Sequence, residues 1–394
     1  MIKTRMLRRN MGENMKNNLK ISLIGPVYPY KGGISHYTGL LYKALVKNGC
    51  DTVLHSYKFQ YPKFLYKKEQ KDERNKQFKI ENTNYSIHTM NPFNWIHAAG
   101  LIKKDKPDLV VIQWWHPYFA PCYYMLCKLL RKQKILFVCH NVFPHERFPL
   151  DKMLTKLVLK QGDYFITQSH MDADDLRSIK PDAKFTVTPH PTYNAFKIAD
   201  MSKAEARDIL KIEDSEKVLL FFGFVREYKG LKYLLKAMPE IAKRLPDARL
   251  WVVGDFGNDR ESYLDLIDSL DIKENVKVVE GYIADGEVEK YFAASDLVVL
   301  PYISATQSGI VQIAYGFSKP VLVTDVGGLP DVVENGRTGY VVKSESHTEI
   351  SAKVIEFFES GIADDFIENI RKEETRFSWD TFVEKLTKLV EDDA

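Results

Sequence analysis

The sequence is poor in cysteine and has no long apolar run. Its four cysteines all lie in the first half and lack the paired spacing of a metal site, so we expect free thiols and no structural zinc. The first twenty residues are basic and contain no apolar core of signal-peptide length, which argues against secretion. The longest uncharged stretch of the first half, 109–127, is interrupted by polar residues and prolines, which argues against a membrane-spanning helix. These absences predict a cytoplasmic protein.

Acidic residues are scarce in the first half. Up to Asp200 there are about 32 Lys and Arg against 16 Asp and Glu, and beyond it about 24 against 37. The net charge of +3 therefore conceals a basic half and an acidic half. A basic half suggests an anionic partner such as nucleic acid, a membrane surface or a phosphorylated acceptor.

The pattern of the chain predicts two doubly wound α/β domains. Short β-branched segments alternate with longer helical patterns, as in parallel sheets covered by helices. The prolines at Pro189 and Pro191 mark the join, because they hold the chain extended and cannot donate to a ladder. The predicted strands are 20–24, 52–56, 109–113, 135–139, 164–167, 185–188, 218–222, 249–253, 276–279, 297–300, 321–324 and 340–342. The expected parts are a basic tail at 1–19, Rossmann-like domains at 20–192 and 193–376, and a terminal helix at 377–394 capped by Ser378 or Asp380.

The loop after the first predicted strand lacks the glycine spacing of a dinucleotide fold. Gly25, Gly32 and Gly33 do not match G-x-G-x-x-G, which weakens a nicotinamide-binding interpretation. Gly32 and Gly33 open a helix and would let a ligand approach the backbone closely. A plain tight turn explains them equally well from the sequence alone.

Two loops of the second half predict an anion site. Arg226 and Lys229 follow one strand, and the polar segment Ser304–Gly309 follows another and opens a helix, whose first N–H groups favour negative charge. Both loops lie at the carboxyl ends of strands of one sheet, where open α/β sheets bind ligands. Because Arg binds two oxygens at once and Lys adds a point charge, a diphosphate would suit the pair.

Several motifs resemble glycosyltransferase family 4, whose members are retaining enzymes of the GT-B architecture. FGFVREYKG, SATQSG and TDVGGLPDVVENGRTGYVV resemble its second domain, and PYKGGISHYTGLL, HNVFPHE and DYFITQSH resemble signatures of its first. The resemblance runs from about Leu19 onward. It implies two Rossmann-like domains facing a cleft, with the C-terminal helix packing back on the first domain. It also implies a hexosyltransferase that moves sugar from a UDP- or GDP-linked donor, held mainly by the second domain, to an acceptor at the first.

The resemblance also implies the roles of particular residues. Arg226 and Lys229 match the pair that binds the diphosphate, although the family's arginine more often stands at the position of Phe224. His140 matches a histidine that contacts the donor sugar, but a rim histidine with a structural role fits the sequence as well. The expected donor-binding residues are Gly32, Gly33, Gly223, Tyr282, Ile283, Thr306, Gln307, Ser308, Gly309 and Gln312. On the acceptor side, His145 and Glu146 would orient a hydroxyl or else pair with surface lysines.

The chain departs from the family in having no paired glutamates near the helix start. Their positions fall on Ala305 and Ile313, and Gln312 could reach the ribose instead. Either the enzyme is active, because the leaving diphosphate takes the acceptor proton, or the protein binds a nucleotide sugar without turnover. We favour activity. An epimerase or a phosphorylase of the same architecture is a further alternative, although no lysine-bound cofactor site of a phosphorylase is evident.

The acidic doublet Asp172-Ala173-Asp174 does not predict a metal site. It lies at a helix start, where acidic residues favour the dipole, and we expect a structural role and no metal or other cofactor.

Aromatic residues alternate with lysines between Tyr57 and Lys79. The segment 57–79 is either a solvated loop or a membrane-surface patch at the inner face of the plasma membrane, which would suit a lipid-linked acceptor. No nucleic-acid-binding motif accompanies it, so we expect no nucleic acid partner. In a patch, Phe59, Tyr61, Phe64 and Tyr66 would enter the headgroup layer while Lys58, Lys63, Lys67 and Lys68 meet anionic lipid. The favoured function is thus transfer of sugar to a glycan or lipid-linked acceptor in surface polysaccharide or glycolipid synthesis.

Overall fold

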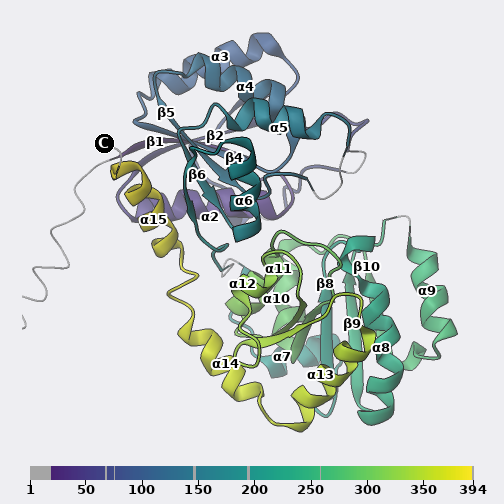
Figure 1. Cartoon of the computed structure of the whole chain (residues 1–394). Coiled ribbons are helices and arrows are strands. Elements are labelled where there is room, and N and C mark those ends of the chain that lie inside the picture. The colour runs from purple at the N-terminus through teal and green to yellow at the C-terminus, as the bar shows by residue number, and fades with distance from the viewer. Residues whose placement is uncertain are drawn as a thin grey trace, which may run out of the picture. The chain divides into compact units, whose positions relative to one another are not determined.

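The structure is a computed structural model that describes residues 19–66, 69–74, 76–144, 148–192, 196–257 and 259–392. Two sheets covered by helices account for most of it (Figure 1). Within the described residues, no helix is both long enough and apolar enough to cross a membrane.

The first sheet has seven strands in the order β3-β2-β1-β4-β5-β6-β7. Its strands are largely apolar and buried, as expected where helices cover both faces. The strands are β1 (Lys20–Ile24), β2 (Asp51–Phe59), β3 (Asn84–His88), β4 (Leu109–Trp114), β5 (Lys134–Cys139), β6 (Tyr164–Thr167) and β7 (Lys184–Val187). The helices among them are α2 (Gly33–Lys47), α3 (Pro92–Lys104), α4 (Ala120–Leu129), α5 (Asp151–Leu159) and α6 (His170–Ile179).

The second sheet has six strands in the order β10-β9-β8-β11-β12-β13, and all five neighbouring pairs are parallel. One apolar cluster, which includes Phe221, Leu234 and Val252, joins the sheet to its helices. The strands are β8 (Lys217–Phe222), β9 (Ala248–Gly254), β10 (Val276–Glu280), β11 (Leu297–Leu300), β12 (Val321–Thr324) and β13 (Gly339–Val342). The helices are α7 (Lys203–Leu210), α8 (Leu231–Arg244), α9 (Arg260–Ser269), α10 (Asp285–Ala294), α11 (Gly309–Gly316), α12 (Leu329–Val332), α13 (His347–Glu359) and α14 (Ala363–Lys372).

In each sheet the chain first adds strands toward one edge and then toward the other. The change occurs between β1 and β4 in the first sheet and between β8 and β11 in the second. Helices that follow neighbouring strands on opposite sides of such a point diverge, and the crevice between them is where open α/β sheets bind ligands. The order therefore places the loops after β8 and β11 next to each other. These are the two loops that the sequence selects for the anion site.

The predicted two-domain α/β class is confirmed, and each predicted strand is present. The strand that was not predicted from the sequence is β3, a short edge strand in which only Ile87 is buried, so it shows little apolar pattern. The last helix, α15 (Trp379–Glu391), lies against β7 at the edge of the first sheet, as expected. Ser378 caps it by accepting a hydrogen bond from the Thr381 N–H, so of the two predicted caps Ser378 is the one used.

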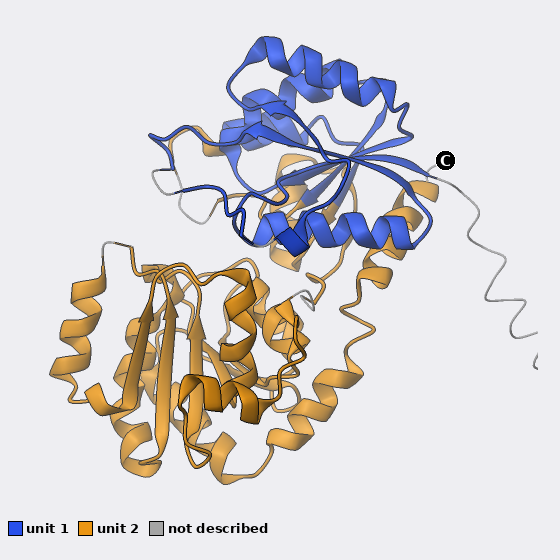
Figure 2. Ribbon diagram, turned by 180° about the vertical axis from the view of Figure 1, so that it is seen from behind, with its two compact units in different colours: residues 1–138, 152–165 blue, residues 139–151, 166–394 orange. Residues whose placement is uncertain are grey.

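The described chain divides into two compact units (Figure 2). One comprises residues up to 138 together with 152–165, and the other comprises 139–151 together with 166 onward. The second unit thus includes the loops that follow β5 and β6. These units differ from the two domains expected from the sequence, whose boundary was placed at 192/193. That boundary stays a prediction.

The predicted membrane patch at 57–79 stays a prediction, but three of its four aromatic residues, Phe59, Tyr61 and Tyr66, pack on other rings. Phe59 stacks on His88 with ring centroids 4.4 Å apart. The Tyr61 ring stacks on Tyr66, and its hydroxyl accepts a hydrogen bond from the Trp115 indole N–H at 3.0 Å. Phe64 is 71% exposed, and Lys67 and Lys68 lie outside the described residues. The aromatic rings gather inward because the phenol and indole satisfy each other's polar groups while their faces pack.

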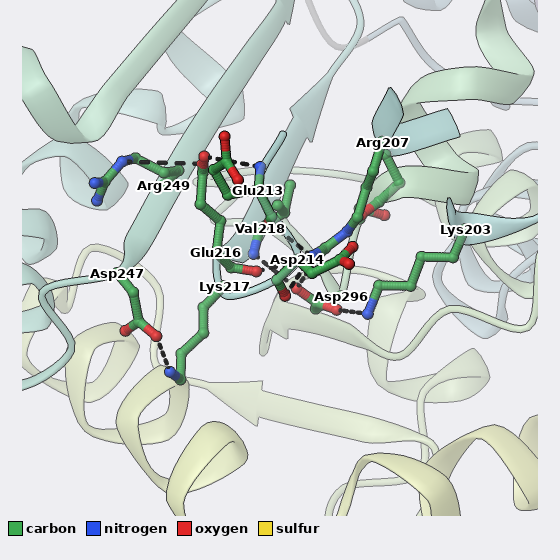
Figure 3. A network of polar contacts seen from close by, with 12 residues as sticks. Lys203, Arg207, Glu213, Asp214, Glu216, Lys217, Val218, Asp247, Arg249 and Asp296 are labelled. Carbon is green, nitrogen blue, oxygen red and sulfur yellow. Dashed lines mark hydrogen bonds and ion pairs between the residues drawn. The ribbon is translucent and has the colours of Figure 1, made fainter. Parts of the chain in front are cut away.

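A buried arginine ties α7 to the second sheet (Figure 3). The Arg207 guanidinium, 3% exposed, directs all five of its N–H groups at oxygens. One of these is a carboxylate oxygen of Asp296, which also accepts from Lys203 and from the Val218 N–H. The other four are the backbone carbonyls of Glu213, Asp214, Glu216 and Ala294. The network joins the segment before β8 to the start of β11.

Replacing Arg207 with alanine is therefore expected to destabilise the protein by roughly 3–5 kcal/mol, because it leaves buried acceptors without donors. Arg244→Ala is a matched control, since the Arg244 side chain is 64% exposed and pairs with Glu359 at the surface. Its expected cost is below about 1 kcal/mol. Urea unfolding of both variants measures the difference. Equal midpoints for the two variants would contradict this assignment.

Candidate active site

The loops after β8 and β11 pack directly on each other. Gly230, at φ +66°, ends the first loop, and a Cβ atom built on it would lie 1.9 Å from the Pro301 carbonyl oxygen. The Ile303 N–H donates to the Tyr228 carbonyl at 2.7 Å. Only glycine permits so close an approach at this backbone conformation. The two loops therefore form one continuous surface at the carboxyl-end edge of the sheet.

Lys229 is a buried cation without an anionic partner. The residue is 9% exposed, and its Nζ lies 5.5 Å from the centroid of the Tyr302 ring. Within the described residues, no hydrogen bond or ion pair to this Nζ is present. Burial lowers its pKa, which the charge of Arg226 lowers further while Tyr228 opposes the change. A buried ammonium group is costly unless an anion compensates it, so the arrangement is suited to an anionic ligand.

Tyr302 connects this lysine to the start of α11. Its hydroxyl lies 3.4 Å from the Ser308 hydroxyl, and burial raises its pKa to about 12, so it remains a neutral phenol. Ser308 caps α11 by accepting a hydrogen bond from the Ile310 N–H. The Gly309 N–H has no partner within the described residues. An uncapped amide at a helix start and a buried ammonium group thus lie on the same surface.

Two further glycines keep the site open beneath the lysine. A Cβ atom on Gly223, at φ +108°, would lie 3.2 Å from the Lys229 Nζ and 3.7 Å from the Ile310 side chain. One on Gly254 would lie 1.8 Å from the Gly223 carbonyl oxygen. The ends of β8 and β9 can therefore approach each other, and the ammonium group keeps its space, only because both residues are glycine.

Arg226 lies on the side of the site toward the β9 loop. Its guanidinium donates to the Val225 carbonyl at 3.1 Å and lies 5.7 Å from the centroid of the Phe224 ring. Its Nη1 lies 2.8 Å from the place where a Cβ atom on Gly257 would be. Arg226 is close enough to Lys229 to influence its pKa, but it does not share the contact with Tyr302. The lysine is therefore the better-placed cation for a group at the start of α11.

A third loop, from the TDVGGLP motif, supports the segment before α11. Gly327 has φ +54°, and a Cβ atom there would lie 1.6 Å from the Ala305 carbonyl oxygen. The Gly328 N–H donates to the Thr306 carbonyl at 2.8 Å. The double glycine is needed because the backbone of one loop rests on that of the other. This contact positions Thr306 and the residues up to Ser308.

The positions of the missing glutamates are apolar and buried. Ala305 is 3% exposed and Ile313 is 7% exposed. Gln312, on the same helix, is 1% exposed, and its Oε1 has no hydrogen bond within the described residues. A buried amide oxygen without a donor is costly, so a ligand hydroxyl could satisfy it. No carboxylate takes the place of the two glutamates at these positions.

The second compact unit also contains residues that follow β5 and β6. The Gln307 side-chain amide donates to the His140 carbonyl at 3.3 Å and to Gln168, and the Thr306 hydroxyl donates to Asn141. His140 is 2% exposed, and burial lowers the pKa of its imidazole well below the usual value, with His190 lowering it further. The imidazole is neutral at physiological pH. Within this unit, the backbone of His140 and the segment before α11 are thus held together.

The remaining predicted donor residues of this unit lie after β10. Tyr282 is 37% exposed and its hydroxyl lies 3.5 Å from Asp285, while Ile283 is half-buried. The Gly281 N–H donates to the Gly254 carbonyl at 3.0 Å, which attaches this loop to the end of β9. The two side chains therefore border the same edge of the sheet as Gly223.

Gly32 and Gly33 belong to the first unit, where they open α2 beside a pocket. Gly32 has φ +106°, and α2 has no side-chain cap at its start. The aromatic residues Tyr61, Tyr66 and Trp115 form part of the pocket wall. Ser35 and Gln60 also line the pocket and are 5% and 8% exposed, and their side chains have no hydrogen-bond partner within the described residues. Such a pocket can bind a sugar ring through aromatic faces and amide groups.

The predicted acceptor residues and the acidic doublet lie after β5 and β6. His145 and Glu146 lie outside the described residues. Of the acidic doublet, Asp172 accepts hydrogen bonds from the Val142 N–H and from Ser169, and Asp174 pairs with Arg177. Burial raises the Asp172 pKa to about 6, which its hydrogen bonds oppose. These contacts agree with a structural role for the doublet. Within the described residues no group of three or more His, Cys, Asp or Glu side chains is placed to hold a metal ion, and the expected absence of a metal stays a prediction.

Tyr302 and Gly327 were not predicted from the sequence as site residues. Tyr302 directly follows the proline that ends β11, and an aromatic residue there carries no signal of its own. Gly327 stands in a motif that served only for the family resemblance. The double glycine was the signal in the sequence, since two glycines at a strand end predict a close backbone approach, and Gly327 has a positive φ in the structure.

Comparison with known proteins gives consistent results for both halves. The family model described as Glycosyl transferases group 1 matches residues 202–373, and the model described as Glycosyltransferase Family 4 matches residues 31–192. An uncharacterized glycosyltransferase of Methanocaldococcus jannaschii is 22% identical over 94% of this chain and 97% of its own length. The N-acetyl-alpha-D-glucosaminyl L-malate synthase of Bacillus anthracis is 25% identical over 69% of this chain and 71% of its own length.

A solved structure shares the fold. Anabaena HepE in complex with UDP-glucose has a TM-score of 0.69 and 17% sequence identity, covering 95% of this chain and 99% of that one. Two parallel α/β domains with these strand orders form the GT-B fold. The chain belongs to glycosyltransferase family 4.

Proposed function

We propose that this enzyme moves a sugar from a nucleoside diphosphate sugar to a glycan or lipid-linked acceptor, with retention of anomeric configuration. One observation supports this proposal more than any other. Lys229 is buried near the start of α11, where the Gly309 N–H has no partner, and Lys229 itself has no carboxylate partner within the described residues. A diphosphate would supply the negative charge that both groups favour. The UDP-glucose complex of the structurally similar HepE supports a donor of this class.

The proposed reaction breaks the bond between the anomeric carbon and the diphosphate oxygen and forms one to the acceptor oxygen. Negative charge grows on the diphosphate as the bond breaks, and the Lys229 ammonium and the Gly309 N–H would stabilise it. Removing one such donor typically costs about 3 kcal/mol of transition-state stabilisation. The acceptor proton passes to the departing diphosphate oxygen. This route needs no carboxylate at Ala305 or Ile313, and none is present.

The other predicted residues would bind the rest of the donor. The unsatisfied Oε1 of Gln312 would accept a hydrogen bond from a ribose hydroxyl, and Tyr282 and Ile283 would border the base. Neutral His140 would contact the transferred sugar. Arg226 would meet the diphosphate from the side of the β9 loop. We propose either UDP or GDP as the nucleotide and no metal or other cofactor.

The acceptor is proposed to bind in the pocket of the first unit. Tyr61, Tyr66 and Trp115 offer faces on which a sugar ring can stack, and Gln60 and Ser35 offer polar groups without protein partners. A sugar acceptor for surface polysaccharide or glycolipid synthesis fits this lining. His145 and Glu146 remain hypothetical acceptor residues.

The experiment is a donor panel followed by turnover. UDP- and GDP-linked sugars are screened for a rise in unfolding temperature, because a ligand at 100 times its Kd stabilises the folded state by about 2.7 kcal/mol. Release of the nucleoside diphosphate is then measured with each stabilising donor and a panel of sugar acceptors. We expect one nucleotide class to stabilise the protein and to support acceptor-dependent release. If no nucleotide sugar binds, the proposed function is wrong.

A second candidate function is binding of a nucleotide sugar without turnover. The buried apolar residues at Ala305 and Ile313 favour it, because relatives of this family usually carry carboxylates there. The same experiment distinguishes the two. A donor that stabilises the protein but is never consumed with any acceptor would favour the binding protein.

A further inference from the structure

Helices α3, α4 and α5 form one layer on one face of the first sheet. α3 packs beside α4, and both views show α5 continuing the row (Figures 1 and 2). The connections from β3 to β4, β4 to β5 and β5 to β6 all cross the sheet in the same direction. Right-handed crossovers therefore put the three helices on the same face. Their buried sides contact the sheet, and their other sides form one surface.

This helical surface exposes large apolar side chains. On α3, Phe93 is 85% exposed and Ile96 is 59% exposed. Met125 of α4 is 36% exposed, and on α5 Met153 and Leu157 are 56% and 39% exposed. A single exposed apolar side chain is ordinary, but a group spread over three adjacent helices indicates an interaction surface.

The part of this face formed by α3, α4 and α5 carries positive charge and almost no negative charge, whereas α6, which connects β6 to β7 beyond them, exposes Asp174. The only carboxylate within the three helices is Asp151, which is 4% exposed. Acidic residues Asp105 and Asp108 follow α3, where Asp105 binds His55 and Asp108 accepts from the Lys20 N–H. The exposed cations on the helices and just after them are Lys103, Lys104, Lys106, Lys128, Arg131, Lys132, Lys152, Lys156 and Lys160.

We propose that the α3–α5 layer docks on an anionic lipid bilayer. Protruding apolar side chains bordered by lysines are what a membrane interface favours, since the apolar groups enter the acyl boundary while the cations meet lipid phosphates. A second copy of this chain fits the surface poorly, because a symmetric contact would bring lysines against lysines. An anionic bilayer complements both the charge and the apolar groups.

The direction in which the three helices run gives the docked unit an orientation. Helices that follow parallel strands begin at the carboxyl-end edge of the sheet, so Phe93, Ile96 and Met153 lie toward that edge and Lys104 and Lys132 toward the other. The pocket beside Gly32 opens from the loops after β1, β2 and β4, at the same carboxyl-end edge. Docking would therefore bring this pocket close to the headgroups. The inference depends only on the surface of the first unit and not on the donor chemistry.

The test is flotation of the full chain with vesicles of phosphatidylcholine alone and with phosphatidylglycerol added, at low and at high salt. Binding is expected only with the anionic lipid and is expected to weaken as salt screens the charges. The variant Lys103→Glu, Lys104→Glu, Lys132→Glu should lower the partition coefficient by about 100-fold or more, because each lysine near the surface contributes about fivefold. The variant Phe93→Ser, Ile96→Ser, Met153→Ser should weaken binding at both salt concentrations.

Matched controls come from the second unit. Lys243→Glu with Lys277→Glu changes exposed lysines there, and Ile209→Ser changes a side chain that is 54% exposed. These variants should bind vesicles like the wild type. The proposal is overturned if wild-type protein does not float with anionic vesicles or floats equally with neutral ones. It is also overturned if the controls lose binding equally, or if the layer variants instead dissociate a dimer in solution.

Discussion

Replacing Lys229 with methionine should lower turnover about 100-fold or more and leave thermal stability unchanged or raised. The loss follows because the ammonium group lies over the Tyr302 ring, whose hydroxyl is 3.4 Å from the Ser308 hydroxyl at the start of α11, where charge on the leaving diphosphate would be stabilised. Stability should not fall, because Lys229 is buried without an anionic partner in the described part of the chain and methionine keeps the apolar stem over the Tyr302 ring. The measurements are kcat at saturating donor and the unfolding midpoint of the same preparation.

Lys232→Met is the matched control for this variant. The Lys232 side chain is 34% exposed and pairs with Glu227 at 3.5 Å, so its removal should change turnover by less than about twofold. Lys229→Met activity within threefold of the wild type would show that the diphosphate is held elsewhere. A marked drop in its unfolding midpoint would show that the lysine has a structural partner instead.

Gly327→Ala should both destabilise the protein and weaken donor binding. The new methyl group would lie 1.6 Å from the Ala305 carbonyl oxygen, and the residue has φ +54°. Strain of this backbone conformation and overpacking each cost about 1–3 kcal/mol, so the sum is roughly 2–6 kcal/mol. Because the segment from Ala305 to Ser308 rests on Gly327 and Gly328, relief of the clash would displace the start of α11. Denaturant unfolding and donor titration measure the two effects.

Gly336→Ala separates backbone strain from the clash. Gly336 also has a positive φ, +76°, but no atom lies within 4 Å of the place that its Cβ atom would take. Its cost should be about 1–2 kcal/mol, with donor affinity unchanged. If both glycine variants lost the same stability and neither affected the donor, the contact between the two loops would have no role in the site.

Much of the fold follows from local sequence patterns. The strands are short β-branched runs, and burial on both faces makes them nearly continuous in apolar residues, as in Leu297–Leu300. The strand β3 does not follow this pattern, because Asn84–His88 lies at a sheet edge and only Ile87 among its residues is buried. Helix starts were predictable where a capping residue precedes the apolar pattern, as Ser378 does for α15.

The loops that form the candidate site were predictable from the sequence, because they follow the ends of predicted strands. Lys229 and Ser308 each follow a strand, and the strand order places those loops side by side. The direction of a long side chain does not follow from its position in a loop. Arg226, three residues before Lys229, lies against the loop of Gly257, while Lys229 lies over Tyr302.

Contacts between distant loops could not be predicted from the sequence. Tyr61 and Trp115 are far apart in the chain, and a hydrogen bond joins them. This contact turns inward part of the aromatic segment 57–79, which the sequence alone made suitable for a membrane surface. The exposed apolar residues of α3 and α5 are visible only once their helices are packed, because their spacing alone does not tell which face is covered. Packing therefore decides which aromatic and apolar residues remain at the surface.

The most direct test of the central claim compares a nucleoside diphosphate with the corresponding monophosphate by calorimetric titration. The claim is that Lys229 and the start of α11 bind the β-phosphate. The wild type should bind the diphosphate at least about tenfold more tightly than the monophosphate, since charge-assisted contacts contribute about 1.5–3 kcal/mol. In Lys229→Met this preference should nearly vanish. A preference for the diphosphate that survives unchanged in Lys229→Met would contradict the account.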